Sequence, residues 1–195
     1  MLSAANFTFS GTFVSDSAIQ LFTFQTSGGT RIRTLSYGGG SNVNSSLVLS
    51  GGFDPLLNIF LSNGDQVGSF DDSAGGTPCI AGSGISAGSN GCLDSYFSGS
   101  LAAGTYTLAL TQFDNLLNGS TLGDGFLSQH LCSSNFCDGF DNVTARTGRW
   151  EVDIIAATSA SVIIAGVPEP GTVALAFVGV CLVAFSRRAG TFQTR

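Results

Sequence analysis

Hydrophobic and polar residues alternate along several short segments, which is the pattern of half-buried β-strands. In residues 6–14, Phe7, Phe9 and Phe13 occupy odd positions, and mostly polar residues lie between them. A period of two places these rings on one face of an extended strand. The same analysis predicts further strands over residues 19–24, 31–37, 56–61, 66–70, 94–101, 105–113 and 150–156, and residues 161–165 extend or follow the last of them.

Turn-forming residues separate these segments and indicate how they connect. Asn63-Gly64 favours a primed hairpin turn between 56–61 and 66–70, with positive φ at both central residues. Residues 102–104 are expected to join the strands on either side of them into a second hairpin. Many short strands with Gly- and Ser-rich loops between them predict an all-β, jelly-roll-like β-sandwich with long Gly/Ser loops.

The composition agrees with this fold class and excludes others. Gly accounts for 27 residues, whereas charged residues make up only 10% of the chain, and this disfavours a helical bundle. A net charge of −6 would repel phosphate, so we expect no nucleic-acid partner. Sixteen Phe argue against disorder. Because arginines are few and exposed ion pairs contribute about 0–1 kcal/mol, we expect the apolar strands rather than charge to stabilise the domain.

The C-terminal segment differs from the rest of the chain. Residues 171–186 carry no charge, and Arg187 and Arg188 follow directly. Sixteen residues make roughly 24 Å of helix, short of the bilayer core of about 30 Å but close enough to cross it. The positive-inside rule then predicts a short C-terminal transmembrane helix with residues 1–168 outside and the arginines in the cytoplasm. The alternative is a buried core helix.

Pro168, Glu169 and Pro170 stand just before this apolar run, where two prolines predict an extended linker. Pro-Glu-Pro, a short apolar helix and a basic cluster together resemble the bacterial PEP-CTERM sorting signal. The resemblance implies export, tethering to the membrane, cleavage near Pro-Glu-Pro by an exosortase, and a setting of extracellular polysaccharide. We therefore expect an exported domain over 1–165, a linker over 166–171, and a transmembrane helix with a basic tail over 172–195.

Proteins with this signal normally begin with a secretory signal peptide. The chain begins Met1-Leu2-Ser3-Ala4-Ala5, without a basic or an apolar leader region. We expect that the true start lies upstream or that the leader was trimmed; the alternative is that the protein is not exported by this route.

The cysteines are consistent with export. Four of the five lie in the predicted outer domain: Cys79, Cys92, Cys132 and Cys137. An even number in loop-like sequence predicts two disulfides, of which 79–92 with 132–137 is the simplest of three connectivities. Closing the first loop would contribute about 3 kcal/mol. The alternative is a zinc site, which the Cys spacing and a single His130 support poorly.

Two segments within residues 48–113 resemble bacterial pre-peptidase C-terminal (PPC) domains. One runs Asp54-Pro55-Leu56 to Phe60 and continues through the Asn-Gly turn to Asp71-Asp72; the other has Asp94-Ser95, then Leu-Ala-Ala-Gly-Thr-Tyr over 101–106. The resemblance implies a jelly-roll-like sandwich. The long Cys-bearing loops depart from the family's compact pattern.

Catalytic chemistry has weak support. Gly84-Ile85-Ser86-Ala87-Gly88 matches G-x-S-x-G, but a nucleophile elbow needs a strand before the Ser and a helix after it, and Gly and Ser surround this match. We expect His130 to be a surface residue in a loop. We therefore expect no enzyme activity.

Clustered carboxylates are the better candidate site. Asp71 with Asp72, and Asp138 with Asp141, lie in or at the ends of loops, where carboxylate oxygens can ligate Ca²⁺. The alternative is turn chemistry, since Asp bonds its own backbone in turns. Calcium is the one cofactor that the sequence suggests.

Two functions remain. The first is a non-enzymatic exported protein that acts at the cell surface or in an extracellular polysaccharide matrix. The second is a carbohydrate- or calcium-dependent binding module, in which exposed Tyr37, Tyr96 or Trp150 would stack on sugar rings.

Overall fold

The computed structural model describes residues 3–74, 78–88, 91–127, 136 and 146–164, and this part of the chain is all-β. It holds twelve strands and one short 3₁₀ helix, η1 (Leu122–Asp124). The chain divides into two compact units, Met1–Ile163 and Ile164–Arg195, and all the strands belong to the first. The all-β prediction is therefore confirmed for the described residues.

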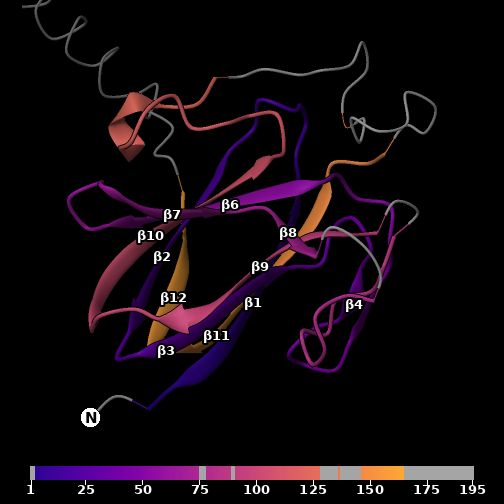
Figure 1. Cartoon of the computed structure of the whole chain (residues 1–195), viewed down its shortest axis with the longest axis horizontal. Helices are drawn as coiled ribbons and strands as arrows, with labels where there is room; N and C mark the ends of the chain where they lie inside the picture. The colour runs from indigo at the N-terminus through magenta and orange to yellow at the C-terminus, as the bar shows by residue number, and fades with distance from the viewer. Residues whose placement is uncertain (1–2, 75–77, 89–90, 128–135, 137–145, 165–195) are drawn as a thin grey trace, which may run out of the picture. The chain divides into compact units, whose positions relative to one another are not determined.

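Ten of the strands form two five-stranded antiparallel sheets, and β4 (Gly40–Ser41) pairs with β5 (Leu47–Val48) in a small separate ribbon (Figure 1). The first sheet has the order β1 (Ala5–Thr12), β11 (Arg149–Ala157), β3 (Gly29–Thr34), β9 (Cys92–Ser100), β8 (Asp72–Ala74). The second sheet has the order β12 (Ser159–Ile163), β2 (Gln20–Thr26), β10 (Gly104–Gln112), β6 (Pro55–Leu61), β7 (Gln66–Phe70).

The core lies where the apolar faces of the two sheets meet. Every second residue is buried over 22–26 of β2, 106–112 of β10 and 150–154 of β11, as the period of two predicts. One cluster joins Phe22 and Leu108 of the second sheet to Val152 and Ile154 of the first. Burying a side chain of this size contributes about 1.5–3 kcal/mol, so the alternation in the sequence accounts for much of the driving force.

Aromatic rings fill one part of this core closely. The indole of Trp150 meets the ring of Phe22 edge-on, with 5.8 Å between ring centroids. Gly11 pairs with Trp150 across β1 and β11, and a Cβ at Gly11 would collide with the indole. A glycine at this point of β1 is therefore a packing requirement of the Trp150 side chain.

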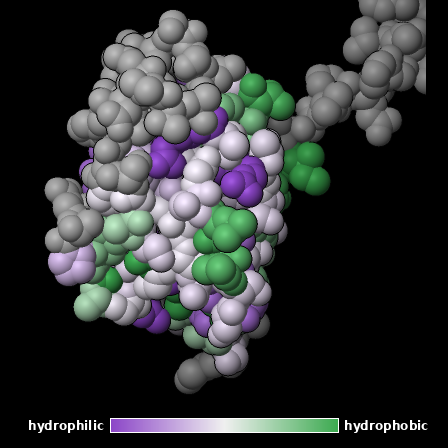
Figure 2. All heavy atoms as spheres, turned by 90° about the vertical axis from the view of Figure 1, so that its right-hand side faces the viewer, coloured by the Kyte–Doolittle hydropathy of each residue, from purple (hydrophilic) through white to green (hydrophobic). Residues whose placement is uncertain are grey.

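The face shown in Figure 2 is mostly pale or hydrophilic. Its hydrophobic residues form small separate groups, not one continuous apolar patch.

The turn between β6 and β7 is not the primed turn that Asn63-Gly64 predicts. Only Gly64 has a positive φ, of 93°, and its N–H donates to the carbonyl of Leu61 at 2.9 Å. The N–H of Leu61 in turn donates to the carbonyl of Asp65 at 2.8 Å. A three-residue loop of this kind needs a left-handed residue only at its last position, which glycine supplies.

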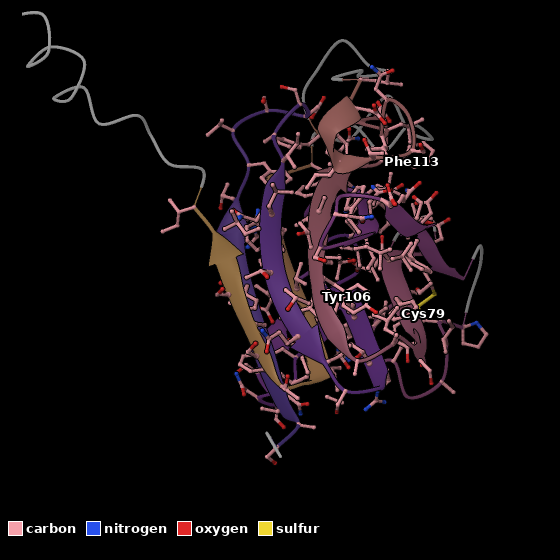
Figure 3. All side chains as sticks on the ribbon, turned by 90° about the vertical axis from the view of Figure 1, so that its left-hand side faces the viewer. Cys79, Tyr106 and Phe113 are labelled. Carbon is pink, nitrogen blue, oxygen red and sulfur yellow. A yellow bond between two sulfur atoms is a disulfide. The ribbon has the colours of Figure 1, made fainter. Side chains whose placement is uncertain are left out.

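The predicted hairpin across residues 102–104 is also wrong. β9 pairs with β3 and β8 in the first sheet, whereas β10 pairs with β2 and β6 in the second. Figure 3 labels Tyr106 on β10, which runs among the strands of the second sheet. A short Gly-containing link can connect two strands of one sheet as a hairpin or cross from one sheet to the other. The local sequence therefore does not distinguish these two connections.

Short strands also lie inside segments that the sequence marks as loops. β8 lies in the Gly- and Ser-rich stretch between the predicted strands 66–70 and 94–101, and β4 lies in the Gly-rich stretch after Tyr37. Two- and three-residue strands have no detectable period, so only the pairing partner reveals them.

A buried ion pair crosses the first sheet, whereas the sequence analysis considered only exposed pairs. Arg33 of β3 contacts Asp153 of β11 at 2.7 Å, and their side chains are 6% and 0% exposed. The guanidinium also donates to the carbonyls of Ser41 and Ser83, and the Asp153 carboxylate accepts from Thr8. The pair therefore attaches two loops to this sheet.

Candidate metal centre

Three aspartates lie together where the chain passes from one sheet to the other. β7 is an edge strand of the second sheet, β8 is an edge strand of the first, and Asp71 is the single residue between them. Leu57 of β6 pairs with Phe70 of β7, so the start of β6 lies beside the end of β7. Asp54, just before β6, is thereby brought to Asp71 and Asp72. Pro55 opens β6, at a position where a strand tolerates the missing N–H.

The three carboxylates are close enough to share one ion. One carboxylate oxygen from each of Asp54, Asp71 and Asp72 lies within 4.8 Å of the other two. Asp54 is buried, at 2% exposed, while Asp71 is half-buried and Asp72 is exposed. The group therefore has one wall inside the protein and one side open to solvent.

Two oxygens of this group lack partners. Oδ1 of Asp54 and Oδ1 of Asp71 are both buried, and neither receives a hydrogen bond from the described residues. A buried polar atom without a partner costs about 1–3 kcal/mol, and more if it is charged.

Burial and mutual repulsion disfavour the ionised forms of these side chains. Burial, then the charges of Asp72, Asp71 and Asp94, raise the pKa of Asp54 to about 9, against a smaller opposing effect of Arg146. Burial and the Asp72 charge raise the pKa of Asp71 to about 6, although the backbone N–H of Asp72 opposes them. Burial raises the pKa of Asp72 as well. The group therefore needs a proton or a cation to offset its charge.

Asp94 lies near this group but is not available as a ligand. Its carboxylate accepts four hydrogen bonds, from Thr34 Oγ1 at 3.0 Å and from the backbone N–H groups of Ser36, Tyr37 and Gly38 at 2.5, 3.1 and 2.8 Å. Burial raises the pKa of Asp94, and these bonds oppose the rise. Asp94 therefore holds residues 34–38 in place and adds negative charge beside Asp54.

The structure changes the set of candidate metal ligands. It brings the predicted Asp71 and Asp72 together, whereas Asp138 and Asp141 lie outside the described residues. Sequence analysis missed Asp54 as a ligand, although Asp54 stands two residues before the predicted strand 56–61, whose hairpin partner ends at Phe70. Extending that antiparallel pairing past its end would have placed Asp54 opposite Ser73, next to Asp72.

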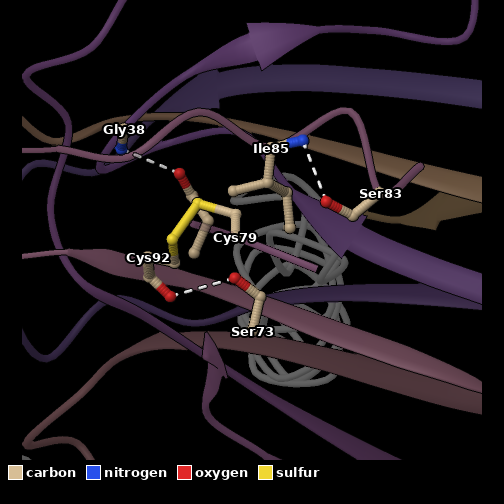
Figure 4. Close-up of a disulfide and its surroundings, with 7 residues drawn as sticks. Gly38, Ser73, Cys79, Ser83, Ile85 and Cys92 are labelled. Carbon is tan, nitrogen blue, oxygen red and sulfur yellow. Dashed lines mark hydrogen bonds between the residues drawn. A yellow bond between two sulfur atoms is a disulfide. The ribbon is translucent and has the colours of Figure 1, made fainter. Parts of the chain in front are cut away.

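The first predicted disulfide is present. Cys79 and Cys92 are linked, with 5.3 Å between their Cα atoms (Figure 4). Cys92 lies in β9 opposite Ala74 of β8, and its carbonyl accepts from Ser73 Oγ at 2.9 Å. Both sulfurs are in the disulfide, so they do not serve as thiolate zinc ligands. Cys132 and Cys137 lie outside the described residues.

The segment around Ser86 is an irregular loop. Ser86 is exposed, and the next element along the described residues is the strand β9, not a helix. Its backbone N–H donates to the carbonyl of Gly39, which ties the loop to the stretch before β4. This is not the strand-to-helix turn of a nucleophile elbow. His130 lies outside the described residues.

The aromatic residues named for sugar stacking are poorly placed for it. Tyr37 is fully buried and Trp150 is 7% exposed with its indole in the core, so the expectation that these rings are exposed is wrong. Tyr96 is half-buried.

A cleft of about 440 Å³ lies between β1, β11 and the 42–49 segment. Its lining includes Asn42, Leu47, Arg149 and Glu151. Burial raises the pKa of Glu151.

The residues of the predicted sorting tail, Pro168, Glu169, Pro170, Arg187 and Arg188, lie outside the described residues. Within the described residues, no helix has both the length and the apolar character that crossing a membrane requires.

No family model matches the chain, and no curated protein matches it in sequence.

Proposed function

We propose that this chain is a non-enzymatic exported protein that acts at the cell surface or in an extracellular polysaccharide matrix. The observation that carries the proposal is the disulfide between Cys79 and Cys92, which joins a long loop to β9. Structural disulfides persist in oxidising compartments and are rare in the cytosol.

The sequence of the C-terminal tail supports the same proposal independently. Pro168-Glu169-Pro170, an uncharged apolar run and Arg187-Arg188 follow one another in the order of a PEP-CTERM signal. In this proposal the tail tethers the chain to the membrane with residues 1–168 outside, and an exosortase cleaves it near Pro-Glu-Pro.

The strand order supports a jelly-roll assignment for the exported domain. Without its edge strands β8 and β12, the first sheet has the order β1, β11, β3, β9 and the second β2, β10, β6, β7. Along the chain β1, β2 and β3 alternate between the sheets, as do β9, β10 and β11, which is the interleaving of an eight-stranded jelly roll. Jelly rolls include lectin domains, so a binding module is the second candidate function. The cleft beside Glu151 and Arg149 is its candidate site for polysaccharide, in place of the buried Tyr37 and Trp150.

Mass spectrometry of the native surface and released forms tests the sorting proposal. We expect the peptides that follow Pro-Glu-Pro to be missing from the mature protein. A variant with Pro168, Glu169 and Pro170 replaced by Ala, Gln and Ala should keep them and stay in the membrane fraction. Recovery of intact Arg195 from the wild-type surface form would contradict the proposal.

A further inference from the structure

We propose that Asp54, Asp71 and Asp72 bind one Ca²⁺ ion at the point where the chain passes from β7 to β8. This inference goes beyond the proposed function and does not depend on it, because it rests on the geometry of the domain alone.

The buried oxygen of Asp54 is the observation that distinguishes this group from an ordinary acidic patch. Asp54 is 98% buried, its Oδ1 has no hydrogen-bond partner, and its carboxylate lies within 4.8 Å of those of Asp71 and Asp72. Two other carboxylates of the domain, both fully buried, are well satisfied. Asp94 accepts four hydrogen bonds, and Asp153 is paired with Arg33.

The charges around Asp54 favour a cation, rather than another hydrogen-bond donor, as the partner of its buried oxygen. Three carboxylates converge, and Asp94 adds a fourth negative charge nearby. Arg146 is the one positive charge that acts on Asp54 among the described residues. Its guanidinium lies over the ring of Tyr37 at 3.3 Å and donates to the carbonyls of Tyr37 and Gly52. A divalent ion would offset the remaining charge and supply the missing partner of Asp54.

The ligand chemistry favours Ca²⁺ over other divalent ions. All three side chains offer oxygen only, which suits hard cations and not zinc or copper. Ca²⁺ binds oxygens at about 2.3–2.6 Å, so two of its ligands lie up to about 5 Å apart, a span that includes the 4.8 Å found here. The exposed side at Asp72 leaves room for the water ligands and for entry of the ion.

Bound Ca²⁺ would connect parts of the two sheets. Asp54 leads into β6 of the second sheet, Asp72 opens β8 of the first, and Asp71 is the link between them. β8 also pairs with β9 beside the Cys79–Cys92 disulfide, so the ion and the disulfide would fasten the same edge of the sandwich.

Calcium titration of the full-length chain tests the inference. Protein treated with chelator and kept in a mild detergent is titrated with CaCl₂ by calorimetry, and its thermal unfolding is followed by circular dichroism. We expect one Ca²⁺ per chain and a rise in Tm of about 5–10 °C at a Ca²⁺ concentration 100 times the Kd. Mg²⁺ at the same concentration should give a smaller rise, because it demands a tighter octahedral site.

Three variants make the test specific. Asp54→Asn and Asp72→Asn should each lose at least tenfold in Ca²⁺ affinity. Asp65→Asn, which changes an exposed carboxylate in the β6–β7 turn, should bind as the wild type does. Asp72 is exposed, so its variant keeps the test valid even if Asp54→Asn fails to fold.

Absence of Ca²⁺ binding by folded wild-type protein would overturn the inference and would mean that protonation alone neutralises Asp54. Unchanged binding by Asp72→Asn would overturn the assignment of the ligands. Equal effects of Mg²⁺ and Ca²⁺ would overturn the choice of ion.

Discussion

At the scale of single residues, Asp94 holds more of the surrounding backbone in place than the sequence pattern around it predicts. Its carboxylate is the acceptor for the Thr34 hydroxyl and for three successive backbone N–H groups after β3. These N–H groups lie beyond the end of β3 and face no carbonyl of a neighbouring strand. A buried acceptor therefore has to satisfy them. One side chain of β9 thereby sets the path of residues 34–38.

Asp94→Asn should therefore destabilise the domain by about 2–4 kcal/mol. An amide offers one acceptor oxygen, and its NH₂ group would face N–H donors that it cannot accept from. Chemical denaturation measures the free energy of unfolding, with Asp65→Asn as a matched exposed control that should change it by less than about 0.5 kcal/mol. Equal stability of the Asp94 and Asp65 variants would contradict this account.

At the same scale, the hydrogen bonds to the Asp124 carboxylate are expected to depend on pH. Its Oδ2 accepts from the Ser120 N–H, the Thr121 N–H and the Thr121 hydroxyl at 2.9, 2.8 and 3.0 Å. Hydrogen bonds from Thr121 and Ser120 lower the pKa of Asp124 from its ordinary 3.8. A lowered carboxyl pKa means that these bonds are present above pH 3.8 and are lost as the pH falls through the lowered value.

The amide resonances of Ser120 and Thr121 should accordingly shift together on acidification, with a midpoint below 3.8. Nuclear magnetic resonance over an acid titration measures this, and Asp124→Asn should abolish the transition. A midpoint at or above 3.8 would show that these bonds do not favour the ionised form.

At the scale of elements, β6 differs from an ordinary amphipathic strand because both of its faces are buried. Leu57 and Ile59 point into the core between the sheets, whereas Phe60 points the opposite way and is still 0% exposed. The near-continuous apolar run of residues 56–61 reflects this double burial. A strand covered on both sides contributes more to stability per residue than an edge strand such as β7.

Phe60→Ala should cost about 3–5 kcal/mol, because it empties a large buried volume. Arg31→Ala in β3 is the control, since Arg31 is exposed, and it should change the free energy of unfolding by less than about 0.5 kcal/mol. Thermal unfolding followed by circular dichroism compares the two. A large loss from Arg31→Ala with none from Phe60→Ala would reverse the assignment of what stabilises the sheets.

At the scale of the whole domain, the Arg33–Asp153 pair joins parts that are distant in the sequence. The pair links β3 to β11, and its hydrogen bonds reach Ser41, Ser83 and Thr8. A buried pair of this kind costs desolvation, so its contribution lies in holding loops in one arrangement more than in net energy.

Removal of one partner should nevertheless be severe. Arg33→Ala would leave Asp153 buried and unpaired, and we expect a loss of about 3–5 kcal/mol. Hydrogen exchange should also show faster exchange at residues 38–50 and 81–88, which a general loss of core packing would not single out. Unchanged exchange in these loops would contradict the role given to the pair.

Much of the fold can be predicted from the sequence because its causes are local. Alternation in residues 6–14 and 150–156 marks strands that the structure contains, and Gly64 marks a turn that it also contains. The pairing of Cys79 with Cys92 is likewise local, since thirteen positions separate them. The Asp71-Asp72 half of the candidate site is visible in the sequence because its two members are adjacent.

What the sequence determined by itself is the class of the domain, since period, turn chemistry and composition act over a few residues. Apart from the β6–β7 hairpin, only the tertiary structure decided which strands pair. The link after β9 has the sequence of a hairpin turn but crosses between the sheets. The third carboxylate beside Asp71 and Asp72 comes from Asp54, seventeen positions before Asp71. Likewise the burial of Arg33 and Trp150 depends on elements that are remote in sequence. Long-range pairing is set by the packing of two sheets against one core, and no short window of residues contains that information.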